Sequence, residues 1–270
     1  MLRVHPTALL ALLVALFVQS SHAQTNPAIA LANLQAARLS VHATASAFHR
    51  YQDSEGDKKQ LVILNGALQQ LKANFQAAYQ DMADLGLSAE LKQVQGHWRN
   101  AARDLNAVMT AISGGGYAEG AITNSYLLNS YYTARDFKAG YDAVISKTGF
   151  KVSPTLQGIR DAAALFQEMA ALYMERSSTE YGYTYRSEAG DTETLDQMAS
   201  RFSKQLDLLD RMTANNPEAA KRLANVRKKW GFLEKSFINY NEKSVPYLVV
   251  KFGGEIVTGL DELSTVYTQP

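Results

Sequence analysis

The chain has 270 residues, of which 46% are hydrophobic and 20% are charged, an ordinary globular composition that argues against a disordered protein. Its 27 basic and 26 acidic residues nearly balance, so the chain lacks the positive field by which proteins gather nucleic acid. It has no cysteine, which excludes disulfides, haem attachment through thioethers and thiolate metal sites.

Residues 1–23 predict a secretory signal peptide. Arg3 supplies the positive charge, residues 8–18 form the apolar run, and residues 21–23 (Ser-His-Ala) form a small-x-small cleavage site. We therefore expect a mature chain that begins near Gln24 and is exported, with a bacterial periplasm as the best fit. No later run of about 18 apolar residues follows, so we expect no membrane span in the mature chain.

The next 125 or so residues predict four helices, because apolar residues recur there in steps of three and four. Asn26-Pro27 combines a capping residue with proline at the first helical position, which is typical of a helix start. Ser88 is expected to cap the third helix, and Gly114–Gly116 to end it. The four helices are expected to end near residues 52, 86, 113 and 145, and a linker follows at 147–152.

The second half of the chain repeats these signals. Ser153-Pro154 and Asn216-Pro217 match the cap-then-proline start, and the stretch LKQVQGHW at Leu91–Trp98 returns as LANVRKKW at Leu223–Trp230. Self-similarity over four helices indicates an internal duplication. The sequence thus predicts an all-α chain of two tandem antiparallel four-helix bundles, the first over residues 24–147 and the second over 148–270.

The third predicted helix carries the pattern Leu91, Val94, Trp98 and Leu105 after a long apolar stripe. This pattern resembles the periplasmic four-helix bundle of type IV pilus methyl-accepting chemotaxis transducers and nitrate/nitrite sensor kinases. The resemblance implies a sensor module whose first helix binds a small oxyanion through arginines. The matching helix of this chain carries the residues Asn33, Leu34, Arg38, Leu39 and Ser40. The resemblance further implies a freestanding relative of the module that works with a membrane receptor or an envelope assembly.

Arg38 and His42 are the candidate ligand-binding residues. Arg38 lies between Leu34 and Val41 on the apolar stripe, where an unpaired guanidinium is costly. Either it reaches water along the helix surface, or it holds an anion. His42 lies one turn further along and adds positive charge below about pH 6.5. Leu172 occupies the matching position of the second half, so only the first bundle is expected to bind a small anion.

A metal site is one interpretation of the histidines, because His42 and His49 share a helix face and His97 is the remaining histidine beyond the signal sequence. The second half has no histidine at the matching positions, and the chain has no Glu-x-x-His pair of the kind that binds two irons. We therefore predict no metal and no cofactor. The alternative function is a metal- or cofactor-carrying bundle, which the methionines also favour.

Aromatic and basic residues allow two interpretations each. Trp98 and Trp230 are predicted to fill the core, with a ligand-pocket wall as the alternative. Tyr181, Tyr183 and Tyr185 form either a recognition surface or packing at the bundle end. The basic run from Lys221 to Lys229 predicts a solvated helix face, with an acidic partner or a lipid headgroup as the alternative.

No phosphate-binding glycine loop, nucleophile elbow or carboxylate pair at a catalytic spacing occurs in the sequence. The sequence therefore predicts a non-catalytic exported protein that acts by binding or by protein–protein interaction, with an envelope or membrane-receptor protein as its partner.

Overall fold

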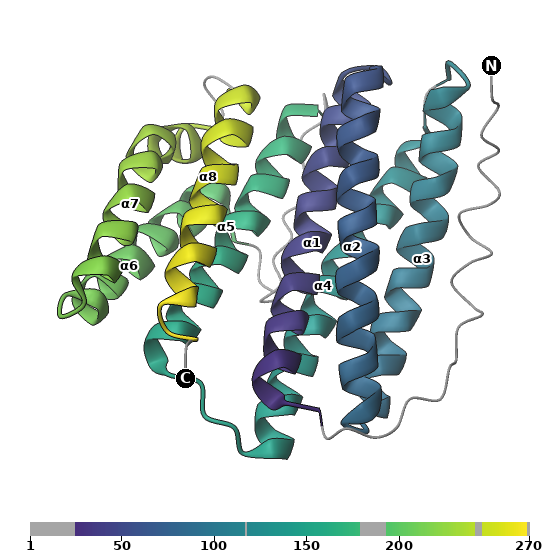
Figure 1. Cartoon of the computed structure of the whole chain (residues 1–270). Helices are drawn as coiled ribbons and strands as arrows, with labels where there is room; N and C mark the ends of the chain where they lie inside the picture. The colour runs from purple at the N-terminus through teal and green to yellow at the C-terminus, as the bar shows by residue number, and fades with distance from the viewer. Residues whose placement is uncertain (1–24, 117, 179–192, 241–244, 269–270) are drawn as a thin grey trace.

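The computed structural model describes residues 25–116, 118–178, 193–240 and 245–268, and these residues form helices and their connections, with no strand among them. The helices, shown in Figure 1, are α1 (Pro27–Asp53), α2 (Lys58–Asp84), α3 (Ser88–Ser113), α4 (Gly120–Thr148), α5 (Pro154–Ser178), α6 (Leu195–Thr213), α7 (Pro217–Ile238) and α8 (Pro246–Thr265).

The helices form two four-helix units that stand side by side, α1–α4 and α5–α8 (Figure 1). Successive helices alternate in direction, and each unit closes by contact between its first and its last helix, α1 with α4 and α5 with α8. The predicted all-α fold with two four-helix units is confirmed. The duplication itself stays a prediction.

Local sequence signals set several helix starts. The side chains of Asn26 and Asn216 accept hydrogen bonds from the first-turn amides of α1 and α7, as predicted, and Ser153 Oγ accepts one from Leu156 N at the start of α5. The prediction that Ser88 caps α3 is wrong. Leu87 holds the cap position, no side chain caps this helix, and Ser88 is its first helical residue.

The fourth helix extends to Thr148, three residues beyond its predicted end. It stops at Gly149, whose backbone φ of 67° lies in the left-handed region that glycine adopts without steric cost. Only residues 149–153 then separate the two units. In this short connection, Phe150 and Val152 are half-buried and pack against the core of the first unit.

The two units are joined by direct packing of α1 on α5, which run parallel to each other (Figure 1). Because each of these helices is covered by its own unit on one side and by the other unit on the opposite side, each is buried on more than one face. Such helices are rich in small and apolar residues around their whole circumference. The buried alanines are Ala30, Ala37, Ala45 and Ala47 on α1, and Ala162, Ala163, Ala164, Ala170 and Ala171 on α5.

The two tryptophans lie in the cores, as predicted. Trp230 is 3% exposed and packs against Phe202, with 4.9 Å between ring centroids, while its Nε1 donates a 2.8 Å hydrogen bond to Ser203 Oγ. Trp98 is half-buried, packs on Phe75 and contacts both core clusters of the first unit. Among the helices described, none is apolar enough over sufficient length to cross a lipid bilayer.

Candidate ligand pocket between the two units

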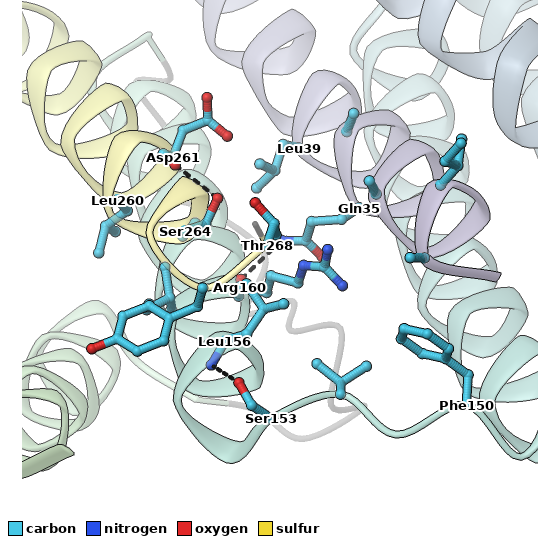
Figure 2. Close-up of a pocket in the computed structure, with 18 of the residues that line it drawn as sticks. Gln35, Leu39, Phe150, Ser153, Leu156, Arg160, Leu260, Asp261, Ser264 and Thr268 are labelled. Carbon is cyan, nitrogen blue, oxygen red and sulfur yellow. Dashed lines mark hydrogen bonds between the residues drawn. The ribbon is translucent and has the colours of Figure 1, made fainter. Parts of the chain in front are cut away.

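A pocket of about 670 Å³ lies where α1 and α5 begin and α8 ends, and the connection between the units closes one side (Figure 2). This volume is in the usual range for small-molecule sites. Most of its wall is apolar, and both units contribute to it. The apolar lining residues are Ala28, Ile29, Ala32, Ala36, Leu39, Phe150, Val152, Leu156, Ile159, Ala163, Val257, Leu260 and Tyr267.

A hydrogen bond between the units holds the two central helices together at this pocket. Gln35 of α1 is 8% exposed, and its Nε2 donates a 2.8 Å hydrogen bond to the backbone carbonyl oxygen of Arg160 in α5. Both residues line the pocket, and Figure 2 shows the Arg160 side chain extending from α5 toward α1. The inner wall is therefore fixed by a buried polar contact in addition to apolar packing.

Arg160 is the principal charged group of the inner wall, and it is 8% exposed. Its Nη1 donates a 2.9 Å hydrogen bond to the Tyr141 hydroxyl, and its Cζ lies 5.7 Å from the centroid of that ring. The Tyr141 hydroxyl in turn donates a 2.8 Å hydrogen bond to Gln157 Oε1. Burial raises the pKa of Tyr141, so this phenol stays neutral at physiological pH.

The other charged groups that line the pocket are exposed, and we call this exposed side the mouth of the pocket. Lys151, on the connection, and Asp261, on α8, both line the pocket and are exposed to solvent. Asp161 follows Arg160 in sequence, but its Oδ1 accepts a 3.0 Å hydrogen bond from Gln157 Nε2. Within the part of the chain that the structure describes, Arg160 forms no ion pair with a carboxylate.

The predicted ligand residues Arg38 and His42 lie elsewhere on α1 and do not line this pocket. Arg38 is half-buried, and His42 is 1% exposed with its ring 5.6 Å from that of Tyr131. They are one helical turn apart, as the sequence requires. Leu172, the residue expected to match on α5, is buried and 2% exposed. A ligand role for Arg38 and His42 stays a prediction, and Tyr181, Tyr183 and Tyr185 lie outside the described residues.

The histidines lie in separate environments. His49 is buried against Phe48, whereas His97 is on α3 with its Nδ1 2.6 Å from Asp136 Oδ2 of α4. Across the described ranges, no three or more histidine, aspartate or glutamate side chains come together in a group that could hold a metal ion.

The basic run on α7 is largely neutralised by acidic residues of the same or neighbouring helices. Arg227 forms ion pairs with Asp207 and Asp210 of α6, and Lys229 Nζ lies 3.1 Å from Glu255 Oε2 of α8. Arg222 pairs within α7 with Glu218 at 2.6 Å. These pairs support the interpretation of the run as a solvated helix face.

Sequence reasoning missed Arg160 and Gln35. A signal for Arg160 was present in α5, where this arginine lies between Ile159 and the apolar run Ala162–Phe166. A cation in such a helix is expected to be buried, but its neighbours come from α1 and α4. The pattern of a single helix does not identify those neighbours.

Comparison with known proteins found no matching protein-family model, no matching curated protein and no matching solved structure.

Proposed function

We propose that this chain is a non-catalytic binding protein that takes a small ligand into the pocket between its two four-helix units. The observation that carries the proposal is the pocket of about 670 Å³, with mostly apolar walls and a few polar groups, at the boundary of two packed units. Small-molecule sites commonly combine these features and commonly lie between domains. Because residues 1–23 resemble a signal peptide, we further propose that the protein is exported. A membrane receptor or an envelope assembly would then distinguish its ligand-bound form from its ligand-free form.

Blocking the pocket tests this function. Ala32 is exposed on α1 and lines the pocket, so Ala32→Trp places an indole in the ligand space without disturbing a core. Straight-chain carboxylates, alcohols and amines of six to ten carbons serve as probes in a thermal-shift assay. At least one class is expected to stabilise the wild type, by about 2.7 kcal/mol at a hundredfold excess over its Kd, and Ala32→Trp is expected to abolish that shift.

Ala73→Trp is the matched control, because Ala73 is also exposed, lies on α2 and is outside the pocket. It should respond to the probes as the wild type does. If no probe stabilises the wild type, or if Ala32→Trp is stabilised as strongly, the ligand-binding function is wrong.

A second candidate function, docking to an acidic protein partner, is favoured by an exposed aromatic patch on α7 and α8. Phe232 is 59% exposed and stacks on Phe252, with 5.5 Å between ring centroids and 18° between ring planes. Lys228, Lys235 and Lys251 are exposed beside this pair, and Lys251 Nζ lies 5.6 Å from the centroid of the Phe252 ring. An exposed phenylalanine flanked by lysines that form no ion pair within the described ranges suits a partner with both apolar and acidic side chains.

The double variant Phe232→Ser with Phe252→Ser tests this second function. In cross-linking of envelope extracts from the source organism, the variant should lose an acidic protein that the wild type retains. Val62→Ser is the control, because Val62 is 70% exposed on α2 of the other unit. If the wild type and the double variant capture the same protein, the aromatic patch is not the docking site for that protein.

A further inference from the structure

Arg160 has an unusual combination of burial and neutral surroundings. Its side chain is more than nine-tenths buried, yet on the neighbouring helix α4 it contacts the hydroxyl and the ring of Tyr141. Because the pKa of Tyr141 is raised by burial, this partner carries no negative charge at physiological pH. A buried cation is costly unless an anion and further hydrogen bonds compensate it.

Neighbouring charges do not supply that anion directly. Asp161 is engaged by Gln157, and Asp261 lies exposed on α8 at the pocket mouth. Lys151, also at the mouth, adds a second positive charge to the lining. The guanidinium presents five N–H donors in a planar fork, of which the Tyr141 hydroxyl occupies one, so donors remain for a carboxylate.

We propose that the pocket selects amphipathic monocarboxylates, in which Arg160 binds the carboxylate and the walls of α1, α5 and α8 bind the apolar body. This inference rests on the proposed ligand-binding function and adds the chemical class of the ligand. The carboxylate would lie at the inner wall beside Gln35 and Arg160, where Figure 2 shows the two side chains together. The apolar body would lie against residues such as Leu39, Leu156 and Leu260.

The ligand head group provides the first test. Octanoate, octanol and octylammonium share one apolar chain and differ in charge, and each is titrated calorimetrically into the full mature protein at constant ionic strength. Octanoate is expected to bind about tenfold or more tightly than octanol, because the alcohol offers the guanidinium one neutral acceptor in place of a charged carboxylate with two. Octylammonium is expected to bind most weakly.

Substitution of the arginine provides the second test. Arg160→Gln should reduce the preference for octanoate over octanol to about one, whereas Arg160→Lys should retain part of it. Arg99→Gln is the control, because it removes the same charge from an exposed position on α3 outside the pocket. It should leave the preference unchanged.

The outcomes separate this inference from the function on which it rests. If none of the three probes binds, the ligand-binding function fails and the inference falls with it. If octanol binds as tightly as octanoate, or if Arg160→Gln keeps the wild-type preference, the pocket binds ligands but Arg160 does not select carboxylates. If octylammonium binds most tightly, the mouth residue Asp261 directs selection and the inference is wrong. The first comparison uses the wild type alone, so it decides the question even if Arg160→Gln does not fold.

Discussion

Asp81 shows how a single side chain on α2 makes the stability of the first unit depend on pH. Partial burial raises the pKa of Asp81, and the nearby Asp84 raises it further, while the hydrogen bond that Asn33 Nδ2 donates to Asp81 Oδ2 at 2.8 Å lowers it. The net direction is upward. The folded protein therefore holds a proton on Asp81 to higher pH than the unfolded chain does, and stability falls as pH rises from the unfolded pKa of about 4 through the folded one.

Asp81→Asn is expected to remove this pH-dependent loss. The asparagine stays neutral and its carbonyl oxygen can still accept the hydrogen bond from Asn33. The variant should therefore match the wild type at pH 3 and exceed it in free energy of unfolding at pH 7, as measured by urea denaturation. An equal difference at the two pH values would contradict the raised pKa.

Asp57 and Ser88 form a matched pair for the energetics of helix capping. Asp57 Oδ1 accepts hydrogen bonds from Lys59 N at 2.8 Å and from Gln60 N at 3.1 Å at the start of α2, whereas Ser88 caps nothing. Asp57→Ala should reduce the free energy of unfolding by about 1 kcal/mol, and Ser88→Ala should have a much smaller effect. Thermal or urea unfolding of both variants measures the contrast, and similar losses in the two would show that the cap on α2 contributes little.

At the scale of the element, α8 carries two adjacent glycines with opposite surroundings. A Cβ at Gly253 would lie 3.1 Å from Phe166 Cε1, a ring held among Phe202, Trp230 and Phe237, whereas a Cβ at Gly254 would meet nothing within 4 Å. The absence of a side chain at Gly253 is thus what allows α8 to approach α5 closely.

Alanine at these two positions is expected to have effects of opposite sign. Gly254→Ala should stabilise the protein by about 0.5–1 kcal/mol, because alanine loses less backbone entropy in a helix. Gly253→Ala should destabilise it by about 1–2 kcal/mol net, because the added methyl forces the Phe166 ring to move in a packed core. Equilibrium denaturation of the two variants provides the measurement, and stabilisation by Gly253→Ala would mean that the core around Phe166 is looser than the structure shows.

The helices themselves were predictable from the sequence because their signals are local. Asn26 and Asn216 act at the starts of their own helices, so the neighbouring residues suffice to place those starts. Ser88 misled the prediction, because a serine at a helix start either caps the helix or becomes its first residue, and the preceding backbone decides which.

The pocket was not predictable in the same way. Its walls come from residues that are more than 200 positions apart, such as Ile29 and Tyr267, and their proximity depends on how one unit packs against the other. Apolar residues spaced three and four apart predicted one buried stripe on each helix. In the structure, α1 and α5 are also buried on the faces that pack against the other unit. The sequence therefore favoured Arg38 as the ligand arginine, and the arginine that lines the pocket is Arg160.

At the scale of the whole molecule, the packing of α1 against α5 predicts that the two units hold together without a covalent link. Each of these helices carries residues that are buried by the neighbouring unit, and both carry buried polar residues, including His42, His49, Glu168 and Glu175. Separation would expose apolar surface along both helices. The two units should therefore behave as one cooperative body.

A specific protease site inserted after Lys151, an exposed residue of the connection, tests this prediction. After complete cleavage, the two fragments should still elute together in size-exclusion chromatography and unfold in one transition. An uncut protein carrying the same insertion controls for effects of the inserted residues. Elution as two separate fragments would show that the connection, and not the helix packing, holds the units together.

Under the proposed ligand-binding function, ligand affinity would depend on how the two units are arranged, and the ligand would in turn stabilise that arrangement. Since α1 belongs to one unit and α5 and α8 to the other, a bound molecule touches both, and part of its binding free energy becomes cohesion between them. A receptor that binds only α6 and α7 and displaces their unit would then lower the affinity for the ligand by some factor. The bound ligand would lower the affinity for that receptor by the same factor. Under the proposed function, the two packed units would thereby report occupancy through their resistance to displacement, with no need for a change in shape.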